Sequence, residues 1–238
     1  MTRELPILFS APMVRAILDG RKTMTRRVVT PQPSDSTMQW LTDAEDRKAG
    51  GWQWLLEQQM TRWRPDDTLW VREAWRTSPA YNRAPPRDIP RDAPVEYLID
   101  PGGVLTGRYR HPRFMPRWFS RVTLRVTDVR IERLQDISEA DAVAEGMIWQ
   151  EPTAEDHQWW KDRCAEFGDD PEADPIQGVW LAPGTRRGFG LTKEERSQPV
   201  WGPTAIFAFQ KTWSAIHGHD AWDANPWVSV TSFKRVAE

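Results

Sequence analysis

The segment from Gly20 to Arg27 places a lysine and two threonines among three arginines. Nearby positive charges disfavour a protonated amine, so the sequence predicts a lowered pKa for Lys22. Such a lysine can take the proton of a threonine hydroxyl and make that hydroxyl a nucleophile. A turn at Thr23 would bring Lys22 near Thr25, whereas a continuous strand would point these two side chains to opposite sides. The same groups can hold a phosphate without doing chemistry, so binding and catalysis both stay open.

A second chemical feature is an arginine-rich segment at 105–135, which holds eight arginines and two acidic residues. Aromatic residues such as Trp118 lie between these arginines, and aromatic rings can stack on nucleic-acid bases. Arginine, unlike lysine, makes planar paired contacts with phosphate. The pattern favours a surface that follows a nucleic-acid backbone. The alternative is that these arginines pair with the thirteen acidic residues of 136–175 and form a solvated face.

Three parts of the chain therefore supply candidate ligand-binding residues: the segment after Gly20, a strand predicted at 67–73 and the arginine-rich segment. These candidates are Arg21, Thr23, Arg26, Arg27, Trp70, Arg72, Glu73, Arg117, Trp118 and Arg121. No metal site is predicted, because Cys164 is the single cysteine and the histidines are scattered. His217 and His219 lie close together after a helix, but a turn explains them better than a metal site does.

Periodicity and capping residues predict short strands separated by turns, with few helices. The predicted strands cover 6–9, a segment from residue 28, 67–73, 95–99, a segment from residue 121 to about residue 131, and 227–236. The predicted helices run from Ser10 to Gly20, from Ser138 to Gly146 and from Thr204 to Gly218. This order favours a small barrel with added helices over a doubly wound sheet.

The strand that begins at Arg121 has a break in its alternation. Its apolar positions change phase near Thr127 and Asp128. A phase change within an alternating strand predicts a β-bulge, a feature that curved sheets and barrels often need.

The 238 residues fit one domain, 1–238, interrupted by insertions at about 31–65 and 148–200. The net charge of −2 hides the local segregation of charge described above. The N-terminal residues do not resemble a signal peptide, and no apolar stretch approaches the thickness of a bilayer. We therefore expect a cytoplasmic protein with no membrane partner. Most of the 15 tryptophans are expected to pack in the core.

Several segments together resemble the ASCH domain of the PUA-like superfamily. The run Ile-Leu-Asp-Gly-Arg-Lys-Thr-Met-Thr-Arg-Arg at 17–27 is similar to the family signature in which a helix end leads into a strand. The run Asp-Asp-Thr-Leu-Trp-Val-Arg at 66–72 is similar to a second signature, although Asp66 stands where the family usually has glycine. Residues 138–147 resemble the family's short helix, and 213–230 resemble long ASCH-like proteins of bacteriophages and prophages.

The resemblance implies an α+β fold, namely a PUA-like small mixed β-barrel decorated by helices and carrying the two large insertions. A protein of this type would bind RNA, DNA or a modified nucleoside in a basic cleft, without a cofactor, and RNA is the first expectation. It would act in the cytoplasm of a bacterial host cell. The sequence leaves the choice of ligand and the oligomeric state open.

The resemblance also implies two enzymatic alternatives. One branch of the family hydrolyses N4-acetylcytidine, and by that analogy Lys22 deprotonates Thr25, Thr25 attacks the amide carbonyl, and Glu145 passes a proton to the leaving amine. Another ASCH type is a ribonuclease, the one case that requires a divalent metal. A structural role in phage assembly is a further alternative without chemistry.

Overall fold

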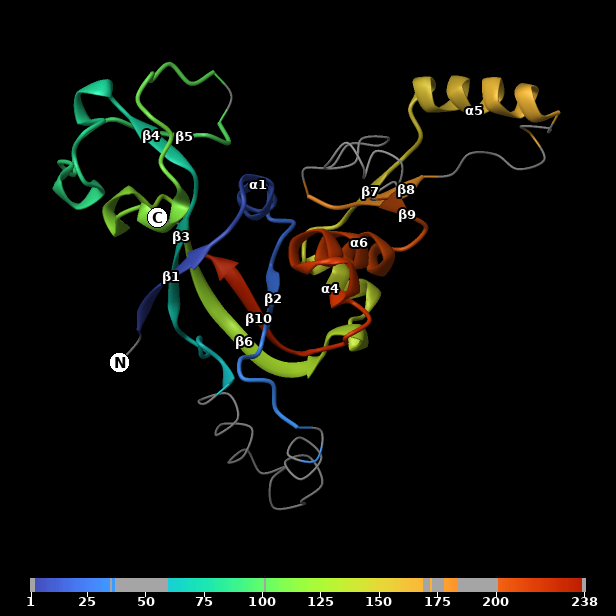
Figure 1. The fold of residues 1–238 in the computed structure, drawn as a ribbon, viewed down its shortest axis with the longest axis horizontal. Helices are drawn as coiled ribbons and strands as arrows, with labels where there is room; N and C mark the ends of the chain where they lie inside the picture. The colour runs from blue at the N-terminus through green and yellow to red at the C-terminus, as the bar shows by residue number, and fades with distance from the viewer. Residues whose placement is uncertain are drawn as a thin grey trace.

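The computed structural model describes residues 3–34, 36, 60–100, 102–168, 172, 178–183 and 201–236. In this part of the chain the fold is α+β, as the sequence predicts, with a mixed five-stranded sheet and few helices (Figure 1). The sheet consists of β1 (Glu4–Leu8), β2 (Met24–Val28), β3 (Thr68–Arg72), β6 (Thr123–Arg133) and β10 (Trp227–Arg235). The strand order is β1-β3-β6-β10-β2. β1 and β3 are parallel, and the other neighbouring pairs are antiparallel.

The predicted bulge is present in β6. The register between β10 and β6 shifts between Ser232, which lies opposite Asp128, and Phe233, which lies opposite Val126. Thr127 is therefore an extra residue in β6, and this confirms the bulge that the change of apolar phase predicts. Because of this extra residue, apolar side chains on both sides of the bulge face the same core.

The two edge strands of the sheet, β1 and β2, approach each other. No backbone pairing joins them among the described residues. Instead, Arg27 Nη2 donates a hydrogen bond to the carbonyl oxygen of Leu8 at 2.8 Å. The sheet is therefore strongly curved, and α1 (Ala11–Leu18) lies near the end of the sheet where this contact forms (Figure 1).

The turn after α1 sets the position of Lys22. Gly20 has φ of +74°, a backbone conformation that glycine adopts at little cost. After this turn the N–H groups of Arg21 and Lys22 both donate to the carbonyl oxygen of Ala16. The chain then passes directly into β2, so the predicted helix end is confirmed.

The helices α4 (Glu139–Ala144) and α6 (Ala205–His217) confirm the other two helix predictions. Their capping residues act as expected, because Ser138 accepts a hydrogen bond from the Asp141 N–H and Thr204 accepts one from the Phe207 N–H. Both helices pack on β2 and β10, and together they bury an apolar cluster that includes Met24, Ala142, Phe209, Trp213, Val228 and Val230.

A second apolar core lies between α1 and the strands β1, β3 and β6. It includes Ile7, Phe9, Val14, Leu69, Val71, Leu124 and Val129. The two cores lie on opposite faces of β10, because Val228 and Val230 belong to the first and Phe233 to the second. The curved sheet is thus supported on both faces.

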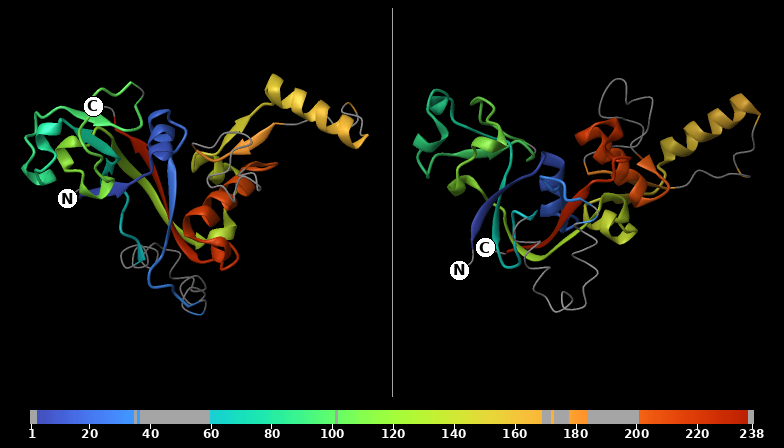
Figure 2. Two further views of the ribbon diagram at one scale, coloured as in Figure 1. Left: turned by 45° about the horizontal axis from the view of Figure 1, so that its top comes forward. Right: turned by 60° about the horizontal axis from the view of Figure 1, so that its bottom comes forward.

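Smaller secondary-structure elements lie outside the five-stranded sheet and its two cores. β4 (Trp75–Thr77) pairs with β5 (Val95–Tyr97), and β7 (Ile148–Gln150), β8 (Val179–Leu181) and β9 (Trp201–Gly202) form a separate sheet. The helix α5 (Ala154–Phe167) projects away from the main sheet in both views (Figure 2). The short 3-10 helices are η2 (Pro79–Tyr81), η3 (Pro86–Asp88), η4 (Pro112–Phe114), η5 (Arg117–Phe119), η6 (Leu134–Asp136) and η8 (His219–Ala221).

The structure describes more of the second expected insertion than of the first. β7, α5 and β8 fall within the insertion expected at about 148–200. Most of the insertion expected at 31–65 lies outside the described residues. No helix of the described part is long and apolar enough to cross a membrane.

Candidate ligand-binding site

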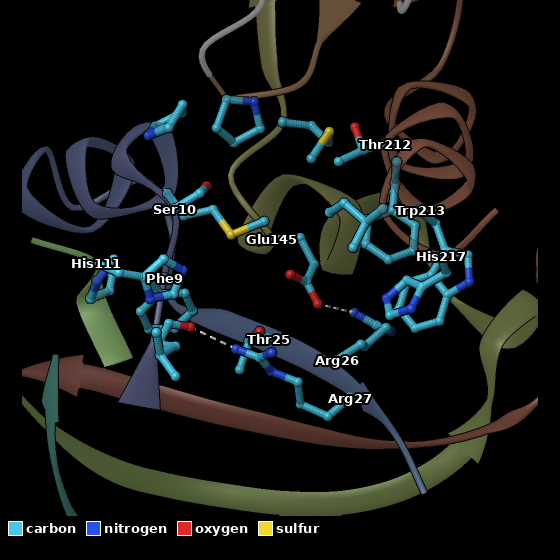
Figure 3. Close-up of a pocket in the computed structure, with 18 residues that line it drawn as sticks. Phe9, Ser10, Thr25, Arg26, Arg27, His111, Glu145, Thr212, Trp213 and His217 are labelled. Atoms are coloured by element: carbon cyan, nitrogen blue, oxygen red, sulfur yellow. Dashed lines mark hydrogen bonds and ion pairs between the residues drawn. The ribbon is translucent and has the colours of Figure 1, made fainter. Parts of the chain in front are cut away.

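A pocket of about 560 Å³ opens along β2, between the start of α1 and the helix α6 (Figure 3). Its walls come from segments that are far apart in the sequence: the end of β1, the start of α1, β2, the end of α4 and one side of α6. Pockets of this size commonly hold small organic ligands. The pocket is therefore the candidate ligand-binding site.

One wall of the pocket is apolar and largely aromatic. Phe209, Trp213 and Ile216 of α6 form this wall, and Phe9 and Met13 line the opposite side of the pocket, beside α1 (Figure 3). The rings of Phe209 and Trp213 lie 5.9 Å apart between centroids, with an interplanar angle of 38°. Aromatic rings beside an open space provide flat apolar surfaces, which suit a planar ring of a ligand.

A buried ion pair between Lys22 and Glu145 lies next to this wall. Lys22 Nζ donates to Glu145 Oε2 at 2.6 Å, to the Glu145 carbonyl oxygen at 3.0 Å and to the Met24 carbonyl oxygen at 2.8 Å. These bonds use the three N–H groups of an ammonium. The side chains of Lys22 and Glu145 are 1% and 6% exposed, so the pair is shielded from solvent except where Glu145 reaches the pocket.

The predicted lowering of the Lys22 pKa is confirmed, but for a different main reason. Burial of the amine lowers its pKa most strongly, and the Glu145 carboxylate partly opposes this effect. Arg26 and Arg27 lower the pKa further, but they contribute less than burial does. The sequence identified the neighbouring cations, whereas the depth at which the amine lies depends on the tertiary structure.

Arg26 holds the other oxygen of the same carboxylate. Its side chain is fully buried, and Nη1 lies 3.4 Å from Glu145 Oε1. Arg26 Nη2 donates to Glu132 Oε1 at 2.7 Å and to Asp141 Oδ2 at 2.8 Å. Arg26 was predicted to bind ligand, and it does line the pocket. Its guanidinium, however, forms ion pairs with three carboxylates and thereby fixes the orientation of Glu145.

The end of α4 brings Glu145 to this position. Gly146 follows Glu145 with φ of +104°, which a residue with a side chain rarely adopts. A Cβ atom at Gly146 would lie 3.1 Å from Pro183 Cγ and 3.4 Å from Lys22 Cβ. The N–H of Thr23 donates to the carbonyl oxygen of Ala144 at 2.9 Å. The start of β2 and the end of α4 are thus tied together by backbone contacts.

Thr25 lies on β2, and its buried side chain lines the pocket. Among the described residues the Lys22 amine bonds to Met24 and Glu145, and no hydrogen bond joins it to the Thr25 hydroxyl. β2 begins at Met24, directly after Thr23, so a sharp turn does not bring Lys22 onto Thr25. The structure therefore brings Lys22, Thr25 and Glu145 to one site, with Glu145 rather than Thr25 in contact with the lysine.

Arg27 and His217 also line the pocket, with the Arg27 guanidinium toward Phe9 and the His217 ring beside Trp213 (Figure 3). Arg27 is exposed, and its guanidinium lies 6.0 Å from the centre of the Phe9 ring. The His217 ring stacks on Trp213 with centroids 4.2 Å apart. Burial, and then the charge of Arg27, lower the pKa of His217 from its ordinary value of 6.5. His217 is therefore mostly neutral near neutral pH.

The remaining predicted ligand-binding residues lie outside the pocket lining. Arg21 pairs with Asp19 at 2.9 Å, and Thr23 is exposed. On β3, the guanidinium of Arg72 stacks over Trp70 with 4.4 Å to the ring centre.

Glu73 and Arg121 belong to a separate charge cluster with Asp100. Arg121 donates to both oxygens of Glu73 at 3.0 Å and to those of Asp100 at 2.6 and 3.1 Å. Burial raises the pKa of Glu73, although Arg121 opposes this effect. Like the Lys22 site, this cluster pairs an arginine with carboxylates, but it contains no lysine and does not line the pocket.

The arginine-rich segment does not face the pocket as a unit. Arg117 pairs with Glu4 at 2.7 Å and Arg125 pairs with Asp66 at 2.9 Å. Trp118 packs against Phe119 and lies under the guanidinium of Arg91. Pairing with carboxylates thus accounts for several of these arginines, but most of the partners lie outside the acidic stretch at 136–175.

The aromatic wall of the site was not predicted from the sequence. Phe209 and Trp213 stand beside Gln210, Thr212 and Ser214, which are ordinary helix residues and do not mark a ligand contact. His217 was considered only as a metal ligand together with His219. The one available signal was that Phe209, Trp213 and His217 recur every four residues on one side of a helix, which indicates a shared face but not a pocket.

Among the described residues no group of three or more histidine, cysteine, aspartate or glutamate side chains could hold a metal ion. The chain matches none of the protein-family models, curated proteins or solved structures with which it was compared.

Proposed function

We propose that this pocket binds the base of a nucleoside or of an RNA nucleotide, in a PUA-like barrel of the ASCH type. The observation that carries the proposal is the juxtaposition of a flat apolar wall with a carboxylate that is fixed from both sides. Phe209 and Trp213 provide the wall, and Glu145 is held by Lys22 and Arg26. A base needs both features, because its faces are apolar and its edges carry hydrogen-bonding groups.

Glu145 is suited to recognise an amino group on the edge of the base. A carboxylate accepts about four hydrogen bonds. The contacts with Lys22 and Arg26 leave part of this capacity free, and Glu145 lines the pocket. Carboxylates accept hydrogen bonds from the amino group of cytosine in nucleic-acid complexes. The proposed ligand is therefore a base with an exocyclic nitrogen, and cytidine and its modified forms are the first to test.

The barrel and the cellular location are parts of the same proposal. The bulge in β6 and the contact between the edge strands β1 and β2 support a sheet curved toward closure. A protein that handles RNA or nucleosides would act in the cytoplasm of a bacterial host cell.

A second candidate function is hydrolysis of an N4-acylated cytidine by Lys22, Thr25 and Glu145. It is favoured by the short contact of 2.6 Å between Lys22 Nζ and Glu145 Oε2, and by the position of Thr25 in the same pocket. Proton transfer across that contact gives a neutral amine and a carboxylic acid. The amine then accepts the Thr25 proton, Thr25 Oγ1 attacks the acyl carbon, and Glu145 gives its proton to the leaving cytosine amine. Water hydrolyses the acyl ester and restores Thr25.

Binding is the first proposal because the Lys22 amine is bonded to Met24 and Glu145 and not to Thr25. Catalysis requires a rotation of the Lys22 amine that the bound substrate would have to induce. No observation on the described residues favours the metal-dependent ribonuclease.

The experiment is a calorimetric titration with cytidine, uridine and N4-acetylcytidine, together with an assay for released acetate. We expect cytidine to bind more tightly than uridine, and we expect this preference to disappear in Glu145→Gln. The matched control is Glu151→Gln, because Glu151 is an exposed carboxylate outside the pocket. If neither cytidine nor N4-acetylcytidine binds, the proposal is wrong. Release of acetate that depends on Lys22 and Thr25 would favour the hydrolase.

A further inference from the structure

Several cationic side chains gather where β1 ends, beside the pocket. Arg27 donates to the Leu8 carbonyl oxygen across the two edge strands. Leu8 pairs in register with Arg72 of β3, so both side chains lie on the same face of these two strands. Leu8 also lines the pocket. Arg27 of the edge strand β2 and Arg72 of β3, the neighbour of β1, therefore both lie next to Leu8 at the pocket rim.

The loop at 111–113 adds to this group. Arg72 Nη1 donates to the carbonyl oxygen of Arg113 at 3.1 Å. His111 and Pro112 line the pocket, so this contact places the Arg72 guanidinium beside the rim. The His111 Nδ1 atom accepts a hydrogen bond from the Arg113 N–H, so the other ring nitrogen remains as a donor.

Arg27 and Arg72 differ from Arg26, Arg121 and Arg130, whose guanidinium groups pair with carboxylates. Arg26, Arg121 and Arg130 each form ion pairs shorter than 3.0 Å. Arg27 and Arg72 form no ion pair with the described residues, and the Arg72 Nε atom is buried without a hydrogen-bond partner. A buried donor without a partner is costly unless a ligand satisfies it.

Positive charge is concentrated around these two guanidinium groups. Burial lowers the pKa of Arg27 and of Arg72 most strongly, and the charge of Arg62 lowers both further. The Glu145 carboxylate raises the pKa of Arg27 and so opposes this lowering, whereas no described carboxylate opposes the lowering of the Arg72 pKa. An anion bound between these guanidinium groups would relieve the repulsion.

We propose that Arg27 and Arg72, with Arg62 nearby, bind a phosphate of the nucleotide whose base occupies the pocket. The inference rests on the proposed function and extends it, since it makes the ligand a nucleotide or an RNA strand rather than a free nucleoside. Arginine suits this role because its planar fork gives paired hydrogen bonds to phosphate oxygens. The Leu8 contact holds one guanidinium at the rim with two nitrogen atoms still able to donate.

The test compares the affinity of the protein for cytidine, cytidine 5′-monophosphate and a cytidine-containing dinucleotide by calorimetry. We expect the phosphorylated ligands to bind at least about tenfold more tightly than cytidine at low salt, and we expect this ratio to fall as salt is raised. A preference for the monophosphate over the dinucleotide indicates a free nucleotide as the ligand, and the reverse preference indicates an RNA strand.

The variants Arg27→Gln and Arg72→Gln should each reduce the ratio of nucleotide to nucleoside affinity by about tenfold. Arg87→Gln is the matched control, because the Arg87 side chain is 85% exposed and does not line the pocket, and the substitution should leave the ratio unchanged. The ratio is independent of the fraction of folded protein, so a loss of stability does not mimic the effect.

Inorganic pyrophosphate separates failure of this inference from failure of the proposed function. Equal affinities for cytidine and its phosphorylated forms would overturn the phosphate site and leave base binding intact. Binding of pyrophosphate that is lost in Arg27→Gln and Arg72→Gln, without binding of any nucleoside, would support the anion site and overturn the proposed function. If neither pyrophosphate nor any nucleotide binds in an arginine-dependent way, the inference is wrong.

Discussion

Two charge clusters in this molecule each pair an arginine with carboxylates, but they lie in different surroundings. In one, Arg26 and Lys22 hold Glu145 beside a pocket. In the other, Arg121 binds Glu73 and Asp100, away from the pocket lining. Burial and pairing are present in both clusters, so these properties alone do not identify a site. The difference is that Glu145 lines the described pocket with its apolar wall, whereas Glu73 and Asp100 do not.

The first prediction concerns the more deeply buried cluster. Arg26→Ala should lower the free energy of unfolding by about 3–5 kcal/mol, because it leaves partly buried carboxylates without their shared cation. Glu132, Asp141 and Glu145 are the carboxylates that lose this partner, with side chains 16%, 20% and 6% exposed. Urea denaturation measures the change. Arg125→Ala removes an exposed ion pair and should cost no more than about 1 kcal/mol. Equal losses would show that the depth of the cluster does not matter.

The second prediction concerns the other cluster and its dependence on pH. Arg121→Gln should lower the free energy of unfolding by about 2 kcal/mol at about pH 8, because Glu73 then stays buried without its cation. The loss should be smaller at about pH 5. Burial already raises the pKa of Glu73, so its ionised form destabilises the fold, and stability falls as the pH rises through this raised pKa.

Urea denaturation at the two pH values measures this effect, and calorimetry with cytidine measures binding. We expect cytidine affinity to be unchanged in Arg121→Gln, because Arg121 does not line the pocket. A strong loss of affinity would mean that the second cluster takes part in ligand binding and would remove the distinction between the clusters.

The third prediction compares two tryptophans. Trp213→Leu should weaken cytidine binding by about tenfold, since it removes an aromatic ring that lines the pocket, and contact of a base with such a ring contributes about 1–3 kcal/mol. Trp118→Leu should leave the affinity unchanged, because Trp118 packs with Phe119 and Arg91 outside the pocket. Calorimetry at a temperature where both variants are folded measures the affinities. If Trp118→Leu weakens cytidine binding and Trp213→Leu does not, the ligand binds to the arginine-rich segment instead.

The fourth prediction is the smallest effect and tests the edge of the apolar wall. Ile216 lines the pocket and is 58% exposed, so it contributes little to the core. Ile216→Ala should weaken cytidine binding by about threefold and leave the thermal midpoint nearly unchanged. Val143→Ala is the control, because Val143 is also exposed but does not line the pocket. A shift in midpoint without a change in affinity would mean that Ile216 is only a packing residue.

The local elements of the fold could be predicted because they depend on short-range chemistry. Gly20, Gly146 and Gly218 end helices where the sequence predicts, and Ser138 and Thr204 cap the helices that follow them. The bulge at Thr127 follows from the alternation of side chains along a single strand. Each of these features is decided by residues within a few positions of one another.

The chemical residues of the site were also visible in the sequence, since Lys22, Thr25 and Glu145 stand at positions that resemble the ASCH signatures. Their partners were not visible. The bond between Lys22 and Glu145 joins residues 123 positions apart, and the bond between Arg26 and Glu132 joins residues 106 positions apart. Only the folded sheet decides which arginines meet carboxylates, because pairing depends on strand order and on burial.

The same reason explains why Arg27 and Arg72 differ from Arg26 and Arg121 in their ion pairs. The sequence alone does not distinguish these four arginines. In the folded chain the curvature of the sheet brings two of them to one rim, where no described carboxylate forms an ion pair with them, whereas Arg26 and Arg121 lie among acids. The sequence by itself determined the helix ends, the bulge and the types of reactive group. The tertiary structure decided which charges are neutralised and which remain available to a ligand, because electrostatic interactions depend on distance in space and on access to solvent.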